Sequence, residues 1–183
     1  MTRTDDVTLL SQRRALLAVP MLAMLAACQA PPTLVVVTSQ AGGPGMLGAQ
    51  LTSTLPPAVP LQTSLTLSYG AAVSGYGSLY TVASSGQVMR LFENRPLRPG
   101  AMIQFPAPSE PVFRFGAPAG TEQFVLTVST QPLGWLTTAD YADQTAFSRL
   151  NLDRMTFEGR LSSALASLPV GSWQAQRLNI TTF

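Results

Sequence analysis

The sequence predicts a mainly β protein, an antiparallel β-sandwich with one C-terminal amphipathic helix packed on it. From Leu61 onward, apolar and polar side chains alternate in short runs that glycine- and proline-rich turns separate. A clear helical period appears late in the chain, and a β-prone tail follows it. Many short strands with frequent turns and a single late helix are typical of a sandwich that carries one helix.

Period-two alternation predicts the strands. Leu65, Leu67 and Tyr69 alternate with polar residues, as in a half-buried strand. Two β-prone runs within residues 77–92 predict a hairpin, and Gly86 supplies the positive φ that its tight turn needs. Further strands are predicted over 101–105, 112–115, 121–130 and 172–183, with a turn-rich loop over 94–100.

The late helix is predicted from apolar residues at helical spacing, which are Phe157, Leu161, Ala164, Leu165 and Leu168. Thr156 is expected to cap its start, and Pro169 is expected to end it. A second, shorter helix is predicted over residues 141–150.

The N-terminal stretch has the pattern of an export signal. Five charged residues lie within the first fourteen, and residues 15–27 then carry none. This apolar run of thirteen residues is shorter than the ~20 that a membrane-spanning helix needs. The motif Leu25-Ala26-Ala27-Cys28 resembles the lipobox of bacterial lipoproteins. That resemblance implies cleavage before Cys28, acyl chains on its sulfur, and an outer-membrane location, because Gln29 stands where aspartate signals inner-membrane retention.

The alternative interpretation of Cys28 is a buried core cysteine. The export interpretation divides the chain into three parts: a lipoprotein signal peptide over 1–27, a lipidated cysteine with a tether over 28–60, and a sandwich domain over 61–183. Six prolines and four glycines between residues 29 and 60 favour the tether. No charged residue occurs from Ala15 to Met89.

Composition excludes several kinds of chemistry. The chain has one cysteine and neither histidine nor lysine. Serine–histidine pairs, serine–lysine dyads, Schiff-base lysines and imidazole metal sites are therefore excluded. We expect no catalytic residue, no metal and no cofactor, unless two carboxylates act together. The net charge is only +2 and the sequence has no basic stripe, so no nucleic-acid partner is expected.

A cluster of arginines is the main candidate for binding. Four of them lie within 25 residues, Arg90, Arg95, Arg98 and Arg114. Guanidinium groups bind carboxylates and phosphates with two parallel hydrogen bonds. Such a face would suit peptidoglycan carboxylates, lipid phosphates or an acidic protein. The alternative is a solvated sheet face with no ligand.

Other candidates have equally plain structural alternatives. Asp140 and Asp143 are either a weak cation site or acids near the start of a helix. Glu93 and Glu122 are either general bases or turn carboxylates. The aromatic residues that could stack on sugars, or else pack in the core, are Trp135, Tyr141 and Trp173.

Residues 77–130 resemble the bacterial family called domain of unknown function 4384. The resemblance rests on the order of three turn motifs, Phe92-Glu93-Asn94, residues 100–106, and Pro118-Ala119-Gly120-Thr121-Glu122. The family often has proline before the asparagine, where this chain has Glu93. The resemblance implies a β-rich fold in an envelope or multidomain bacterial setting, and it implies no activity.

These observations predict a non-catalytic envelope lipoprotein, attached to the membrane by its lipid. Its sandwich would be a periplasmic protein-interaction or assembly module, including an accessory role in a secretion system. The first alternative is a module that binds peptidoglycan or another glycan. The second alternative is a carboxylate-dependent hydrolase, which would need two acids about 5–10 Å apart in one cleft.

Overall fold

The computed structural model describes residues 37–41 and 47–183, with side chains over 47–183. The predicted signal peptide 1–27, Cys28 and the first part of the tether lie outside these residues. The described elements, in chain order, are β1 (Val37–Ala41), β2 (Gln50–Ser53), β3 (Ala58–Val59), β4 (Leu67–Gly70), β5 (Gly75–Val82), β6 (Val88–Leu97), β7 (Met102–Phe105), β8 (Gly120–Ser129), η1 (Thr138–Asp140), β9 (Ser148–Arg149), α1 (Arg154–Ala166) and β10 (Trp173–Thr182).

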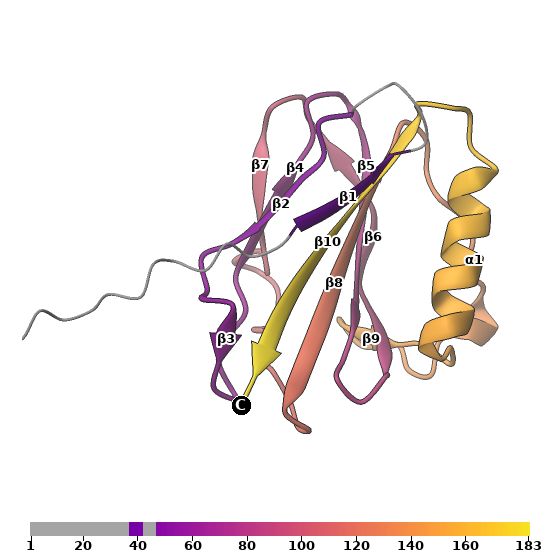
Figure 1. Cartoon of the computed structure of the whole chain (residues 1–183). Helices are drawn as coiled ribbons and strands as arrows, with labels where there is room; N and C mark the ends of the chain where they lie inside the picture. The colour runs from indigo at the N-terminus through magenta and orange to yellow at the C-terminus, as the bar shows by residue number, and fades with distance from the viewer. Residues whose placement is uncertain (1–36, 42–46) are drawn as a thin grey trace, which may run out of the picture. The chain divides into compact units, whose positions relative to one another are not determined.

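These elements form two sheets and one helix. The large sheet has the order β1-β10-β8-β5-β6-β9, with β3 also paired to β10, and the small sheet has the order β2-β4-β7. All strand pairs are antiparallel except the short pairing of β3 with β10. The small sheet packs on one face of the large sheet, and α1 lies along the other face (Figure 1). The predicted sandwich with a packed C-terminal helix is confirmed.

The space between the two sheets is filled by large apolar side chains. The alternation predicted for residues 63–69 is confirmed, because Leu65, Leu67 and Tyr69 are all buried there. Ring contacts with centroids 4.7 to 6.2 Å apart link the aromatic residues of this core. Phe113 and Phe115 point inward and Arg114 outward, but only Arg114 forms an isolated bridge, with Ser64, so the predicted strand over 112–115 is not a full strand.

The opposite face of the large sheet is covered by α1 and the loops around it. Phe157, Leu161 and Leu165 are buried against this face, as their spacing predicted. The second face of β8 is also buried, which explains why Val125 interrupts the alternation of that strand. Both faces of the large sheet are therefore covered by apolar side chains and exclude water.

Two predictions for the helical regions are wrong. The N-cap of α1 is Asp153, whose Oδ1 accepts the backbone N–H of Thr156 at 2.7 Å, so Thr156 lies inside the helix. A carboxylate at this position also suits the positive end of the helix dipole. The predicted helix over 141–150 is not formed: this segment holds bends and the short strand β9, and side chain–backbone bonds of Asp143 and Thr145 hold it in place.

The predicted tether 28–60 needs correction over its second half. Leu47, Ala49 and Leu51 are buried in the inter-sheet core, and residues 50–53 and 58–59 are strands. The side chain of Gln174 accepts the backbone N–H of Ala49 at 3.0 Å, and Gln176 donates to the Ala49 carbonyl at 2.8 Å. These two glutamines of β10 are the hydrogen-bond partners of the backbone N–H and C=O of Ala49, which would otherwise be buried without partners. The folded part therefore begins before residue 61.

The predicted loop 94–100 is also partly a strand. β6 continues to Leu97, and it carries two extra residues relative to β5 between Arg95 and Arg90. Asn94 lies in the first of these bulges with a φ of 51°. Its side chain donates to the Leu133 carbonyl at 3.1 Å and accepts the Leu133 N–H at 2.7 Å. Asn94 thereby fixes the loop that follows β8.

Candidate functional site

The two arginines of β6 lie on opposite faces of the large sheet. The guanidinium of Arg90 lies on the helix side, 4.9 Å from the ring centroid of Tyr141. Arg95 lies on the inter-sheet side, 4.3 Å from the ring centroid of Phe92, and forms an ion pair with Glu110. Side chains alternate between the two faces along a strand. The two bulges between Arg90 and Arg95 leave these side chains on opposite faces.

The other two arginines lie elsewhere again. Arg98 is exposed in the turn after β6, and it forms no ion pair within residues 47–183. Arg114 is exposed beside the small sheet, where its guanidinium donates to the Gln62 carbonyl at 3.1 Å. The structure therefore separates Arg90, Arg95, Arg98 and Arg114, and the single arginine face that the sequence predicted does not form.

Arg90 contributes to a polar pocket of about 290 Å³. The pocket is lined by Arg90, Thr138, Tyr141, Asp143, Gln144 and Ser148. Arg90 Nη2 donates to Ser148 Oγ at 3.0 Å, whereas its buried Nε–H has no hydrogen-bond partner among the described residues. One guanidinium, three hydroxyl groups, an amide and the carboxylate of Asp143 thus line the same pocket.

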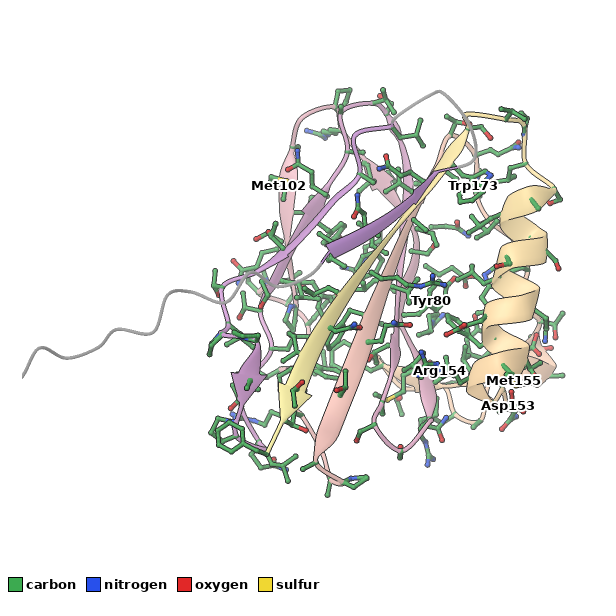
Figure 2. The ribbon with its side chains drawn as sticks, viewed as in Figure 1. Tyr80, Met102, Asp153, Arg154, Met155 and Trp173 are labelled. Atoms are coloured by element: carbon green, nitrogen blue, oxygen red, sulfur yellow. The ribbon has the colours of Figure 1, made fainter. Side chains whose placement is uncertain are left out.

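A hydrogen-bonded chain connects this pocket to the interior on the helix side. Trp135 Nε1 donates to Tyr80 Oη at 3.1 Å, and Tyr80 Oη donates to Glu93 Oε1 at 3.4 Å. Tyr141 Oη donates to Glu93 Oε2 at 3.0 Å. Tyr80 lies between the large sheet and α1 (Figure 2). Glu93 therefore accepts from two phenol groups.

Burial raises the pKa of Glu93 above its usual range, while the Tyr141 hydroxyl and the charge of Arg90 oppose part of that rise. Burial also raises the pKa of Tyr80 and of Tyr141, so both phenols stay protonated and can donate to Glu93. A carboxylate with two such donors is a stable structural contact.

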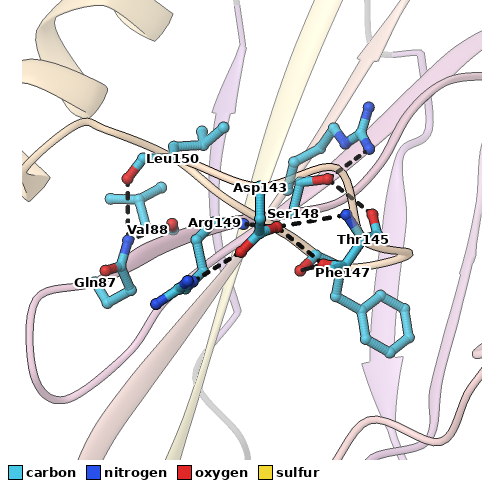
Figure 3. Close-up of polar contacts among 9 residues, drawn as sticks. Gln87, Val88, Asp143, Thr145, Phe147, Ser148, Arg149 and Leu150 are labelled. Carbon is cyan, nitrogen blue, oxygen red and sulfur yellow. Dashed lines mark hydrogen bonds and ion pairs between the residues drawn. The ribbon is translucent and has the colours of Figure 1, made fainter. Parts of the chain in front are cut away.

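Asp143 organises the loop beside the Arg90 pocket (Figure 3). Its Oδ2 accepts from Arg149 Nε at 2.8 Å, and its Oδ1 accepts from Thr145 Oγ1 at 2.9 Å and the Arg149 N–H at 3.2 Å. The bond from Arg149 is the main reason that the pKa of Asp143 falls to about 2. Gln87 Nε2 adds a link to the Leu150 carbonyl at 3.0 Å.

Asp140 has a different partner and takes no part in a pair with Asp143. Arg160 of α1 donates to both carboxylate oxygens of Asp140, at 2.6 and 3.0 Å, and to the Trp135 carbonyl at 2.9 Å. Arg160 and the Thr137 N–H hold the pKa of Asp140 well below its usual range. Arg160 thus ties the helix to the loop 135–140, a long-range contact with no signal in the sequence.

The aromatic candidates are mostly packing groups. Trp135 lies edge-on to Tyr80 and tilted against Phe157, with centroids 5.7 and 5.6 Å apart. Trp173 is half-buried beside the same core (Figure 2). Tyr141 is the member of this group that also lines the Arg90 pocket.

Glu122 differs from the other candidate acids. It lies on the inter-sheet side of β8, is 3% exposed, and its Oε2 has no hydrogen-bond partner in the described part of the chain. Burial raises its pKa to about 7. Glu122 lines a second pocket, of about 230 Å³, together with Arg114 and residues of the β5–β6 turn.

Cys28 lies outside the described residues, so its predicted lipidation stays a prediction. Within residues 37–41 and 47–183, no helix is long and apolar enough to cross a membrane. In that same part of the chain, no three cysteine or acidic residues gather closely enough to hold a metal ion.

Comparison with protein families, with curated proteins and with solved structures finds no match. The resemblance to the domain of unknown function 4384 therefore stays a prediction.

Proposed function

We propose that this chain is an envelope lipoprotein whose sandwich is a non-catalytic binding module, and that the Arg90 pocket is its recognition site. The observation that carries the proposal is the partly unpartnered guanidinium of Arg90 in a polar pocket. A guanidinium beside hydroxyl groups suits a carboxylate, which can come from an acidic protein segment or from the cell wall. Of these two ligands, we propose an acidic protein segment as the one that the Arg90 pocket binds.

The arrangement of carboxylates supports binding over hydrolysis. Glu93 accepts from two tyrosines, Asp140 pairs with Arg160, and Asp143 pairs with Arg149. The Arg90 pocket holds one carboxylate, Asp143, and the second pocket also holds one, Glu122. A two-carboxylate mechanism would need both acids in one cleft. We therefore rank the hydrolase alternative last.

The lipid anchor has a separate test. Mass spectrometry of the mature protein should show an acylated N-terminus at Cys28, and Cys28→Ala should release the protein from membranes. Two acyl chains or more are needed for stable attachment, so loss of the sulfur removes the anchor entirely. A Cys28→Ala protein that stays with membranes and keeps Met1 would contradict this part.

The recognition site is tested by crosslinking in intact cells and by sedimentation with purified peptidoglycan. Arg90→Gln should lose the crosslinked partner, and Arg98→Gln is the matched control because it removes the same charge. Arg98 lies eight positions further along the chain, just beyond the end of β6, which is roughly 20 Å away. Equal crosslinking of Arg90→Gln and the native protein would refute the site.

The glycan alternative rests on the three hydroxyl groups and the amide in the Arg90 pocket, which suit a sugar acid. Co-sedimentation with peptidoglycan that Arg90→Gln abolishes, with no protein partner crosslinked, would favour this alternative over the acidic protein segment.

A further inference from the structure

Glu122 is a buried acid without a counterion. Its side chain faces the inter-sheet core beside Phe124, at the start of β8, and its direct neighbour across the sheet is Ile180. Its Oε2 has no hydrogen-bond partner in the described part of the chain. Buried carboxylates are normally paired or hydrogen-bonded, so an exception of this kind calls for a functional reason.

The space next to Glu122 is a small pocket between two turns. The β5–β6 hairpin and the start of β8 meet at one end of the large sheet (Figure 1). Ser84 of the hairpin donates to the Pro118 carbonyl, which joins the two segments. The remaining walls come from Met89, Phe113 and the loop that follows Phe113. At about 230 Å³ the pocket admits a group the size of one side chain.

No charged side chain that lines the pocket forms an ion pair with the Glu122 carboxyl group. Ile180 of the neighbouring strand β10 lies opposite Glu122, Met89 of β6 lines the pocket, and the hairpin presents the uncharged Ser84 and Gln87. Arg114 is the one other charged residue that lines this pocket, and its guanidinium donates to the Gln62 carbonyl instead. The sequence contains no lysine, so no side-chain ammonium group of this chain can serve as the partner.

We propose that this pocket binds a primary ammonium group on an unbranched apolar stem, with Glu122 as the carboxylate that pairs with it. The apolar walls fit the stem, and Glu122 at the wall accepts hydrogen bonds from the ammonium group. A lysine side chain of a partner protein and a free alkylamine share this chemistry. The site lies on the other side of the large sheet from the Arg90 pocket, and it does not depend on the proposed function.

Binding should depend on pH because an ammonium group pairs with the ionised form of Glu122. With a pKa of about 7, the carboxyl group is mostly ionised at pH 8 and mostly neutral at pH 5.5. The dissociation constant should therefore rise about 30-fold from pH 8 to pH 5.5, in proportion to the loss of the competent form. Occupancy should in turn lower the pKa of Glu122.

The test is an NMR titration of the full chain, labelled with ¹⁵N and ¹³C. The probe is Nα-acetyl-lysine methylamide, and the uncharged control is Nα-acetyl-norleucine methylamide, which keeps the four-carbon stem and lacks the ammonium group. At pH 8 the lysine probe should shift the amides of residues 83–87 and 113–117 in a saturable way. Glu122→Gln should weaken this binding at least about 30-fold, because it removes one partner of a buried charge pair. Glu158→Gln, which replaces a partly exposed acid of α1 that pairs with Arg154, should leave it unchanged.

A second measurement uses the native protein alone, so it remains valid if a variant fails to fold. The ¹³Cδ resonance of Glu122 should titrate near pH 7 without the probe and at lower pH with it. Equal binding of the norleucine probe, equal binding to Glu122→Gln, or an unshifted titration would each overturn the proposal.

Cadaverine and a lysine-containing peptide then distinguish a free amine from a protein segment as the occupant. Arg90→Gln should bind the lysine probe normally, which separates this site from the recognition site.

Discussion

The two faces of the large sheet treat their acidic residues differently. On the helix side, Glu93 lies between two tyrosines and Asp140 is clamped by Arg160. On the inter-sheet side, Glu110 pairs with Arg95, whereas Glu122 forms no ion pair among the described residues although Arg114 lines the same pocket, and burial raises the pKa of Glu122 to about 7. An acid with partners strengthens the packing around it, whereas an acid without a partner weakens it. The difference identifies Glu122 as the residue that the fold alone does not explain.

The two faces also differ in how they are held together. The inter-sheet core consists of large side chains such as Phe105 and Phe124, which are fully buried. The helix side has a smaller apolar stripe, and polar clamps from Asn94 and Arg160 hold its loops. We therefore expect apolar truncations between the sheets to have the largest effects on stability, and loss of the clamps to have smaller ones.

The largest expected effect is that of Phe105→Ala. Removal of a fully buried ring from the inter-sheet core leaves a cavity, and the free energy of unfolding should fall by about 3–5 kcal/mol. Urea unfolding followed by circular dichroism measures the change. A loss smaller than that caused by Asn94→Ala would reverse the comparison between the two faces.

Asn94→Ala should destabilise the protein by about 2–3 kcal/mol. The substitution removes both hydrogen bonds to the Leu133 backbone and forces alanine to a φ of 51°. Asn94→Gly loses the same bonds but tolerates the positive φ, so it should be about 1 kcal/mol less destabilising. Equal stabilities of the two variants would show that the backbone conformation contributes nothing.

Glu122→Gln should stabilise the protein by about 2 kcal/mol at pH 8. The folded state raises the pKa of Glu122 to about 7, so the native protein loses stability as pH rises from about 4 to about 7 and Glu122 must ionise while buried. The neutral amide removes that loss. Unfolding at pH 8 and at pH 4 measures it, and the gain should be absent at pH 4. A stabilised Glu158→Gln control would instead indicate a general charge effect.

Asp140→Asn should destabilise the protein by about 1–2 kcal/mol at pH 7, because Arg160 loses its charged partner. The folded state lowers the pKa of Asp140, so this contribution is complete above about pH 4 and declines as the pH falls further. The variant and the native protein should therefore converge in acid. A difference that does not shrink between pH 5 and pH 2 would contradict the ion pair as its cause.

The sequence determined the elements that depend on local patterns. Alternation at Leu65, Leu67 and Tyr69, the turn at Gly86 and the spacing of Phe157, Leu161 and Leu165 correctly predicted strands, a hairpin and a helix. These signals succeed because the period of burial is set by backbone geometry within a few residues. The same reasoning failed over 141–150, where side chain–backbone bonds of Asp143 and Thr145 decide the conformation.

Tertiary structure decided the partners of polar groups. Gln176 holds Ala49 across 127 positions of sequence, so residues first interpreted as a tether belong to the fold. The separation of Arg90 from Arg95, the clamp of Arg160 on Asp140 and the lack of a partner for Glu122 follow from strand register and bulges. Local periodicity cannot encode such contacts, because they form only when distant segments pack and exclude water between them.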